Sequence, residues 1–146
     1  MTTDRGWLEH AVALAWRCPP VTTAFSVGAC LVDAAGTLLA EGWSRELDPL
    51  DHAEEDVLAK LGPTYRAAPG TTLYSSLEPC SVRASRPRTC TELILAAGVP
   101  RVVFAWREPR VFVACDGAER LAAAGVEVVE LADLAEQARA VNKHLL

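Results

Sequence analysis

Residues 71–106 read TTLYSSLEPCSVRASRPRTCTELILAAGVPRVVFAW and contain a strand–helix–strand pattern. TTLYSSL (71–77) and RVVFAW (101–106) are short runs rich in β-branched and aromatic residues, which is typical of strands. Between them, CTELILAAG (90–98) is a helix candidate that ends at a glycine. Because two strands joined by a helix pair in parallel, this stretch predicts an α/β domain.

The rest of the chain continues this alternation. Apolar spacing predicts further helices over residues 6–18, 50–62, 116–125 and 131–146. Strand-like runs cover residues 25–33, 37–44 and 126–131, and the AAG between the first two suggests a hairpin. We therefore expect a single domain over residues 1–146, a three-layer α/β/α sandwich with a central five-stranded mixed sheet.

Composition narrows the class of protein. The chain has 146 residues, of which 51% are apolar and 23% charged, as is usual for globular proteins. A net charge of -5 argues against nucleic acid as a partner. No apolar run is long enough to span a membrane, and the N-terminal residues lack the pattern of a signal peptide. We expect a cytoplasmic protein that does not bind membranes.

Two of the five cysteines and one histidine lie where an α/β fold places ligands. Cys80 follows the strand at 71–77, Cys90 opens the next helix, and His52 lies in the first turn of the helix at 50–62. One imidazole and two thiolates make a three-ligand zinc site whose fourth position is open to water. The other cysteines, an odd number, are expected to be structural: Cys18, Cys30 and Cys115.

The residues after His52 suggest how such a site could act. Zinc lowers the pKa of a bound water, and a carboxylate beside the metal can take up and return the proton. Glu54 has this position, whereas Glu55 and Asp56 are assigned to the solvated face of a helix that Asp51 caps. The alternative is a zinc-stabilised binding domain without catalysis, which would close the site with a fourth protein ligand.

The triplet HAE (52–54), followed by EPC (78–80) and a second cysteine, resembles the zinc-dependent cytidine and deoxycytidylate deaminase superfamily. The nine residues between Cys80 and Cys90 make the chain similar to the deaminase domain of bacterial riboflavin biosynthesis. VGACLVDAAGTLLAEGW (27–43) and LILAAGVPRVVFAWREP (93–109) extend this resemblance over most of the chain. It implies a cytidine deaminase-like fold, Zn2+ held by His52, Cys80 and Cys90, Glu54 as proton shuttle, and a homodimer or homotetramer.

The resemblance also implies a reaction and a small-molecule substrate. A hydrolytic deaminase would replace the exocyclic amine of a pyrimidine-type heterocycle, such as the diaminopyrimidine precursor of riboflavin, with oxygen and release ammonia. A cytidine-type nucleoside or nucleotide and a purine base are alternatives. A deaminase acting on nucleic acid is disfavoured, because such enzymes have the short C-x-x-C spacing and this chain is acidic.

Six residues are expected to contact the substrate. The stretch TTAFSVG (22–28) stands where the family has T-x-P-N-P, and Ser76 lies just before LEPC. Guanidinium groups bind phosphate through paired hydrogen bonds, so the arginines between the two cysteines could hold a phosphate, although a solvated loop is an equal alternative. The expected contacts are Phe25, Ser26, Ser76, Arg83, Arg86 and Arg88.

Overall fold

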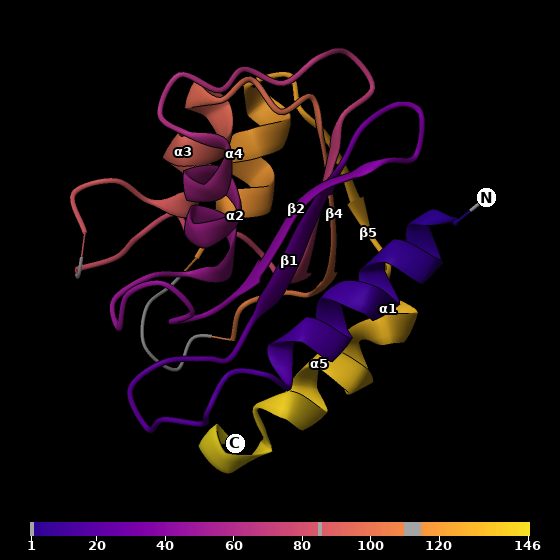
Figure 1. Ribbon diagram of the computed structural model, residues 1–146. Helices are drawn as coiled ribbons and strands as arrows, with labels where there is room; N and C mark the ends of the chain where they lie inside the picture. Colours follow the sequence, from indigo (N-terminus) through magenta and orange to yellow (C-terminus); the bar gives the residue numbers. More distant parts are fainter. Residues whose placement is uncertain (1, 85, 110–114) are drawn as a thin grey trace.

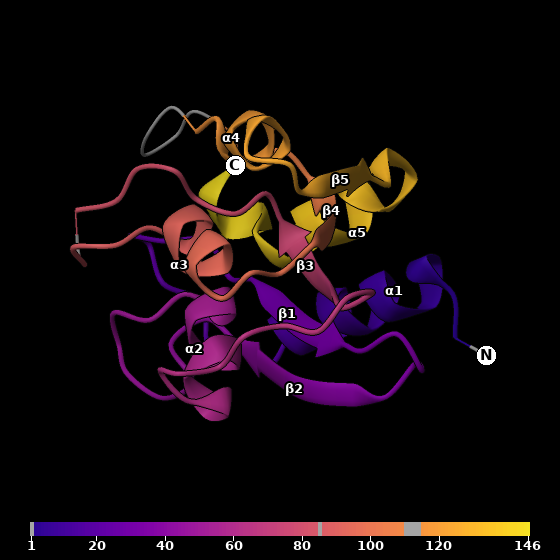
Figure 2. The ribbon, with the colours of Figure 1, turned by 90° about the horizontal axis from the view of Figure 1, so that it is seen from above.

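The computed structural model, which describes residues 2–84, 86–109 and 115–146, has a mixed five-stranded sheet at its centre. Figure 2 shows the strands in the order β2-β1-β3-β4-β5. The first three strands pair antiparallel, whereas β3, β4 and β5 pair in parallel. The strands are β1 (Gly28–Val32), β2 (Leu38–Trp43), β3 (Thr72–Leu77), β4 (Arg101–Trp106) and β5 (Glu127–Glu130). The expected hairpin and the expected parallel half are both confirmed.

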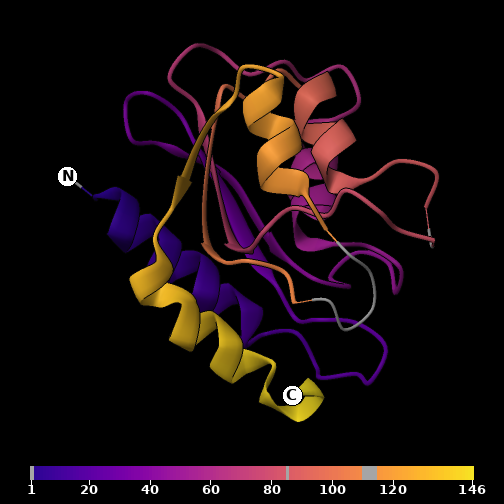
Figure 3. The same ribbon diagram turned by 180° about the vertical axis from the view of Figure 1, so that it is seen from behind.

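Helices cover both faces of this sheet, which confirms the three-layer sandwich. Figures 1 and 3 show one group of helices on one face of the sheet and a second group on the other. The first group consists of α1 (Asp4–Ala15) and α5 (Ala135–Val141), with the short 3-10 helices η1 (Ala132–Leu134) and η2 (Lys143–Leu145) on either side of α5. The second consists of α2 (Ala53–Leu61), α3 (Cys90–Ala96) and α4 (Gly117–Ala123). Among the described residues, no helix is long and apolar enough to cross a bilayer.

Each interface between sheet and helices has its own apolar core. Leu31, Leu73 and Val102 pack with α2, α3 and α4 on one face of the sheet. Cys30 and Val103 point to the other face, where they pack with α1 and α5. This alternation along the strands explains why β1 and β3 are buried throughout.

Gly28 allows α1 to pack closely against β1. A Cβ atom added at this glycine would lie 1.9 Å from the carbonyl oxygen of Ala11, so no larger residue fits without moving the helix. The strand begins at Gly28, three residues later than expected, and Phe25 and Ser26 therefore belong to the loop that enters it.

The last helix is shorter than expected because a buried asparagine ends it. The Oδ1 atom of Asn142 accepts a hydrogen bond from the Ser26 amide at 2.6 Å, and its Nδ2 atom donates to the Ser26 carbonyl at 2.9 Å. These bonds fasten the C-terminal segment to the loop before β1. The helix expected over residues 131–146 is thus divided into η1, α5 and η2.

Candidate active site

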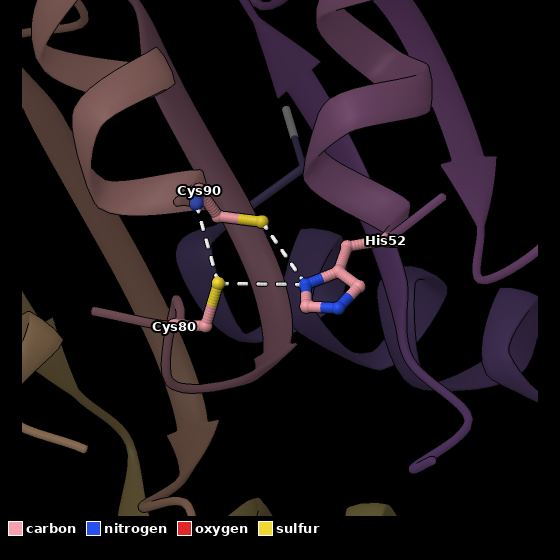
Figure 4. Close-up of side chains that lie close together, drawn as sticks. All are labelled: His52, Cys80 and Cys90. Carbon is pink, nitrogen blue, oxygen red and sulfur yellow. Dashed lines mark hydrogen bonds between the residues drawn. The ribbon is translucent and has the colours of Figure 1, made fainter. Parts of the chain in front are cut away.

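Three side chains from separate segments converge on the face covered by α2 and α3. His52 is the N-cap of α2, Cys80 follows β3, and Cys90 is the first residue of α3. The Nδ1 atom of His52 lies 3.5 Å from the Sγ atom of Cys80 and 3.3 Å from that of Cys90 (Figure 4). All three donor atoms lie within 4.8 Å of one another. The structure therefore brings together the three ligands predicted from the sequence.

These donors fit zinc. Tetrahedral zinc with bonds of about 2.0–2.3 Å requires its nitrogen and sulfur ligands to be roughly 3.5 Å apart, which matches the observed separations. The set is also chemically typical, because imidazole and thiolate are the ligands that zinc prefers. Among the described residues, no fourth His, Cys, Asp or Glu joins this cluster. The three side chains could thus hold a zinc ion with one position left for another ligand.

Hydrogen bonds between the two cysteines prepare one of them as a thiolate. The Sγ atom of Cys80 accepts a hydrogen bond from the Cys90 amide at 3.2 Å, at the N-terminus of α3. A second hydrogen bond, from the Cys90 thiol, lowers the pKa of the Cys80 thiol to about 4. Burial opposes this shift, and the nearby His52 adds to it. The same bond, together with burial, raises the pKa of Cys90. One proton is therefore readily lost from this pair.

Glu54 lies in the first turn of α2 and is only 4% exposed. Its Oε1 atom accepts a hydrogen bond of 3.3 Å from the hydroxyl of Ser75 on β3. Burial raises the pKa of this carboxyl. A buried carboxyl with a raised pKa beside a metal cluster is suited to carry a proton, and the role of Glu54 as proton shuttle stays a prediction.

The helix that carries Glu54 has its N-cap one residue later than predicted. Its N-cap is His52, whose amide donates to Glu55 at 3.1 Å, and the expectation that Asp51 caps the helix is wrong. The assignment of Asp56 to the solvated face is also wrong, since this side chain is fully buried. Glu55 pairs with Arg83 at 3.1 Å and is largely covered.

A cavity of about 390 Å³ opens beside this cluster, a size that suits a small molecule. Its wall combines apolar side chains with several charged ones. Phe25 contributes an aromatic edge that packs against Trp106, with the ring centres 5.5 Å apart. The lining comes from five segments: Thr23, Ala24, Phe25 and Val27; Ser44 and Arg45; Pro49, Leu50, Asp51, His52 and Glu54; Leu77, Glu78, Cys80, Val82, Arg83 and Ala84; and Glu108.

Of the six residues expected to contact the substrate, two line the cavity and four do not. Phe25 and Arg83 line the cavity. Ser26 and Ser76 are buried beside it, and the hydroxyl of Ser76 accepts a hydrogen bond from the Gly28 amide at 3.1 Å. Arg86 and the exposed Arg88 are not among the lining residues. A direct contact of each with substrate stays a prediction.

Acidic partners surround two of the loop arginines. The Arg83 side chain is 3% exposed, pairs with Glu55 at 3.1 Å and donates to the Leu50 carbonyl at 2.8 Å. Arg86 pairs with Asp48 at 2.9 Å and with Asp51 at 3.0 Å. Both arginines therefore tie the loop between the cysteines to the segment that precedes α2.

Two carboxyl groups and an arginine complete the cavity wall without having been assigned to the site from the sequence. Glu78 accepts hydrogen bonds from the amides of Glu108 at 3.1 Å and Ala118 at 3.0 Å. Burial raises the pKa of Glu108 to about 7, and its Oε2 atom has no hydrogen-bond partner. Arg45 enters from the turn after β2. Of these three residues, only Glu78 has a sequence position that indicates a place at the site, because it directly precedes Pro79-Cys80.

Comparisons with known proteins agree with this geometry. Residues 1–106 match the family model described as the cytidine and deoxycytidylate deaminase zinc-binding region. The chain is 40% identical over 127 residues to diaminohydroxyphosphoribosylamino-pyrimidine deaminase of Schizosaccharomyces pombe, covering 85% of this chain and 31% of that protein. It is 36% identical over 126 residues to riboflavin biosynthesis protein RibD of Escherichia coli, covering 86% of this chain and 33% of that protein.

Solved structures show the same fold. Acinetobacter baumannii RibD superposes with a TM-score of 0.78 at 30% identity, over 97% of this chain and 38% of that chain. Aspergillus oryzae Rib2 deaminase in complex with DARIPP superposes with a TM-score of 0.76 at 23% identity, over 97% of this chain and 99% of that chain. This chain spans about a third of the length of the curated relatives described above. By its sequence match and its three converging zinc ligands, the chain belongs to the cytidine and deoxycytidylate deaminase family.

Proposed function

We propose that this protein is a zinc-dependent hydrolytic deaminase of a phosphoribosylamino-substituted diaminopyrimidine. The observation that carries the proposal is the placement of Glu54 in one cavity with His52 and Cys80, two members of the three-ligand cluster. The names of the relatives in yeast and bacteria support this substrate class. The reaction consumes water and exchanges the exocyclic amine of the ring for oxygen, releasing ammonia.

His52, Cys80 and Cys90 would hold the zinc ion. Zinc bound there supplies a Lewis acid that lowers the pKa of water, so that hydroxide becomes available near neutral pH. Glu54 would accept the proton that the water gives up.

Glu54 would then return protons to the substrate. The first goes to the ring nitrogen next to the carbon under attack. Glu54 would then take the second proton of the added water and deliver it to the exocyclic amine, so that the carbon–nitrogen bond breaks and the amine leaves as ammonia. Burial, which raises the pKa of Glu54, brings it closer to the pKa that general acid–base catalysis at neutral pH requires. The surrounding apolar wall, including Phe25 and Leu77, would exclude other water from the ring.

The proposal is tested by measuring ammonia release from the phosphorylated diaminopyrimidine by the zinc-loaded protein and by Glu54→Gln. We expect the variant to keep its zinc and its fold while losing at least about a thousandfold in kcat, as expected when a general acid–base is removed. Metal analysis and circular dichroism of both proteins are the controls. Turnover by Glu54→Gln at the wild-type rate would refute the role of this carboxyl.

We further propose that the protein is a cytoplasmic homodimer or homotetramer. Leu47, Leu50 and Val82 are about half exposed, and the last two also line the cavity, so a second copy packed there would cover apolar surface. All five cysteines are unpaired, which fits a reducing compartment. Light scattering after size-exclusion chromatography measures the assembly, and a monomer at high protein concentration would contradict this part of the proposal.

A further inference from the structure

Arg45 lies in the turn after β2, and its side chain reaches the loop that follows α1. Its Nη2 atom contacts the Sγ atom of Cys18 at 2.8 Å and lies 3.3 Å from both the Pro19 carbonyl and the Ser26 hydroxyl. Its Nη1 atom donates to the Phe25 carbonyl at 3.3 Å. The acceptors are thus two backbone carbonyls, one hydroxyl and one cysteine sulfur. In the described parts of the chain, no carboxylate pairs with this guanidinium.

This environment distinguishes Arg45 from the other arginine that lines the cavity. Arg83 is paired with Glu55, and its neighbour Arg86, outside the lining, contacts three carboxylates. Their positive charges are therefore largely compensated within the protein. The charge of Arg45 is not compensated in this way, although its residue lines the same cavity as His52 and Glu54.

The backbone conformation of Arg45 is strained, which points to a functional role for its side chain. Its φ angle is 61°, and it is the one non-glycine residue in the described chain with a positive φ. This left-handed conformation costs an ordinary residue about 1–2 kcal/mol, whereas glycine adopts it readily. The amide of Arg45 donates to the Asp51 carbonyl at 2.8 Å, which holds the turn in place. A strained residue at a cavity wall is a signature of functional sites.

Besides Arg45 and Arg83, the cavity wall contains four acidic side chains. Asp51, Glu54, Glu78 and Glu108 all line the cavity, so a phosphate bound there needs a cation whose charge is not already taken up by a carboxylate. We propose that Arg45 binds the phosphate monoester of the substrate and so selects the phosphorylated diaminopyrimidine. This inference rests on the proposed function and adds to it the residue that recognises the phosphate.

The contacts of Arg45 also suit it to this role. Its Nε atom donates to no atom of the described residues, so donors remain for a ligand. The bonds to the loop at residues 18–26 hold the guanidinium in one place before substrate arrives. A preordered side chain loses little conformational entropy on binding, which favours affinity.

Steady-state kinetics with two substrates that differ only in the 5′-phosphate test the proposal. We expect Arg45→Gln to lower kcat/KM for the phosphorylated diaminopyrimidine by about 10- to 100-fold, mainly through KM, the range for a lost hydrogen bond to a charged group. The change for the dephosphorylated compound should stay within about threefold. Arg45→Lys should be intermediate, because lysine keeps the charge but loses the planar fork.

Two further variants separate recognition of phosphate from a loss of structure. Arg45→Gly removes the side chain where the backbone favours glycine, so its thermal unfolding should stay close to that of the wild type while the same selective loss appears. Arg66→Gln is the matched control, because Arg66 is exposed and follows the C-terminal end of α2, whereas His52 caps the N-terminal end. It should leave both substrates unaffected.

Two outcomes would overturn the proposal. An equal loss on both substrates would show that Arg45 only holds its loop, and a selective loss in Arg83→Gln instead would assign the phosphate to the loop between the cysteines. If the wild type deaminates neither compound, the proposed function fails, and calorimetry with ribose 5-phosphate then tests Arg45 alone. Binding at least tenfold weaker in Arg45→Gln would support the proposal, and equal affinity would overturn it.

Discussion

Asp56 is fully buried although it lies in the acidic first turn of α2. Its Oδ2 atom accepts a hydrogen bond from the Leu47 amide at 3.2 Å, while its Oδ1 atom has no partner that donates to it. Burial, and a hydrogen bond that its protonated form makes to Asp51, raise the pKa of Asp56 to about 7. The folded protein therefore prefers this carboxyl in its neutral form.

This preference predicts a pH dependence of stability. In the unfolded chain Asp56 ionises near pH 4, and in the folded protein near pH 7, so the free energy of unfolding should fall as the pH rises between these values. Asp56→Asn imitates the neutral form, because its amide can donate to Asp51 at every pH. We expect it to be more stable than the wild type at pH 8 by on the order of 4 kcal/mol, and equal at pH 4.

Chemical denaturation at several pH values measures this difference. Asp133→Asn is a suitable control, since Asp133 is an exposed surface acid paired with Arg5. A constant difference between Asp56→Asn and the wild type from pH 4 to pH 8 would contradict the assigned pKa.

Local motifs made the zinc ligands and Glu54 predictable, because HAE and EPC lie at the ends of elements that the sequence shows clearly. The residues of the cavity wall were harder to predict from the sequence. Arg45 and Glu108 come from segments far from these motifs, and only the tertiary fold brings them to the same cavity. The carboxylates that pair with Arg83 and Arg86 also depend on that fold.

At the scale of elements, α4 supports the loop that carries Cys80. A Cβ atom added at Gly117 would lie 1.9 Å from the carbonyl oxygen of Pro79, directly before Cys80. Glu78 joins the same two segments through the Ala118 amide. The start of α4 is thus packed against the backbone of the metal-binding loop.

Gly117→Ala should therefore weaken both folding and metal binding. The added methyl must displace either α4 or the Pro79–Cys80 backbone, and overpacking of this kind costs about 1–3 kcal/mol. We expect a lower melting temperature and at least a tenfold weaker affinity for zinc, measured by competition with a chelating dye. Ala122→Ser, at an exposed position of α4, should change neither quantity. Unchanged zinc affinity in Gly117→Ala would show that the loop adapts without cost.

The strands and helices themselves were largely predictable from apolar periodicity, but their ends depended on long-range contacts. The C-terminal segment has a helical pattern to its last residue, yet Asn142 ends α5 by bonding to Ser26, which lies 116 positions earlier in the sequence. Likewise, the N-cap of α2 is His52 rather than Asp51, and Asp51 instead pairs with Arg86 of the cysteine loop. Neither partner can be identified from a local pattern.

At the scale of the whole molecule, the zinc ligands occupy one side of a fold that has two apolar cores. The cluster joins α2, α3 and the loop after β3, all on the same face of the sheet. The core between the sheet and α1 and α5 contains none of the three ligands. Burial of both cores should be sufficient to keep the chain folded without metal.

Removal of zinc should therefore abolish activity without unfolding the protein. A ligand that binds only the folded state at a thousand times its Kd adds about 4 kcal/mol of stability, which for a chain of this length corresponds to roughly 10 °C in Tm. We expect chelated protein to keep its far-ultraviolet circular dichroism, to melt about 10 °C lower, and to recover turnover when zinc is restored. Because a domain that needs zinc to fold would instead lose its secondary structure on chelation, that result would favour a structural zinc site over a catalytic one.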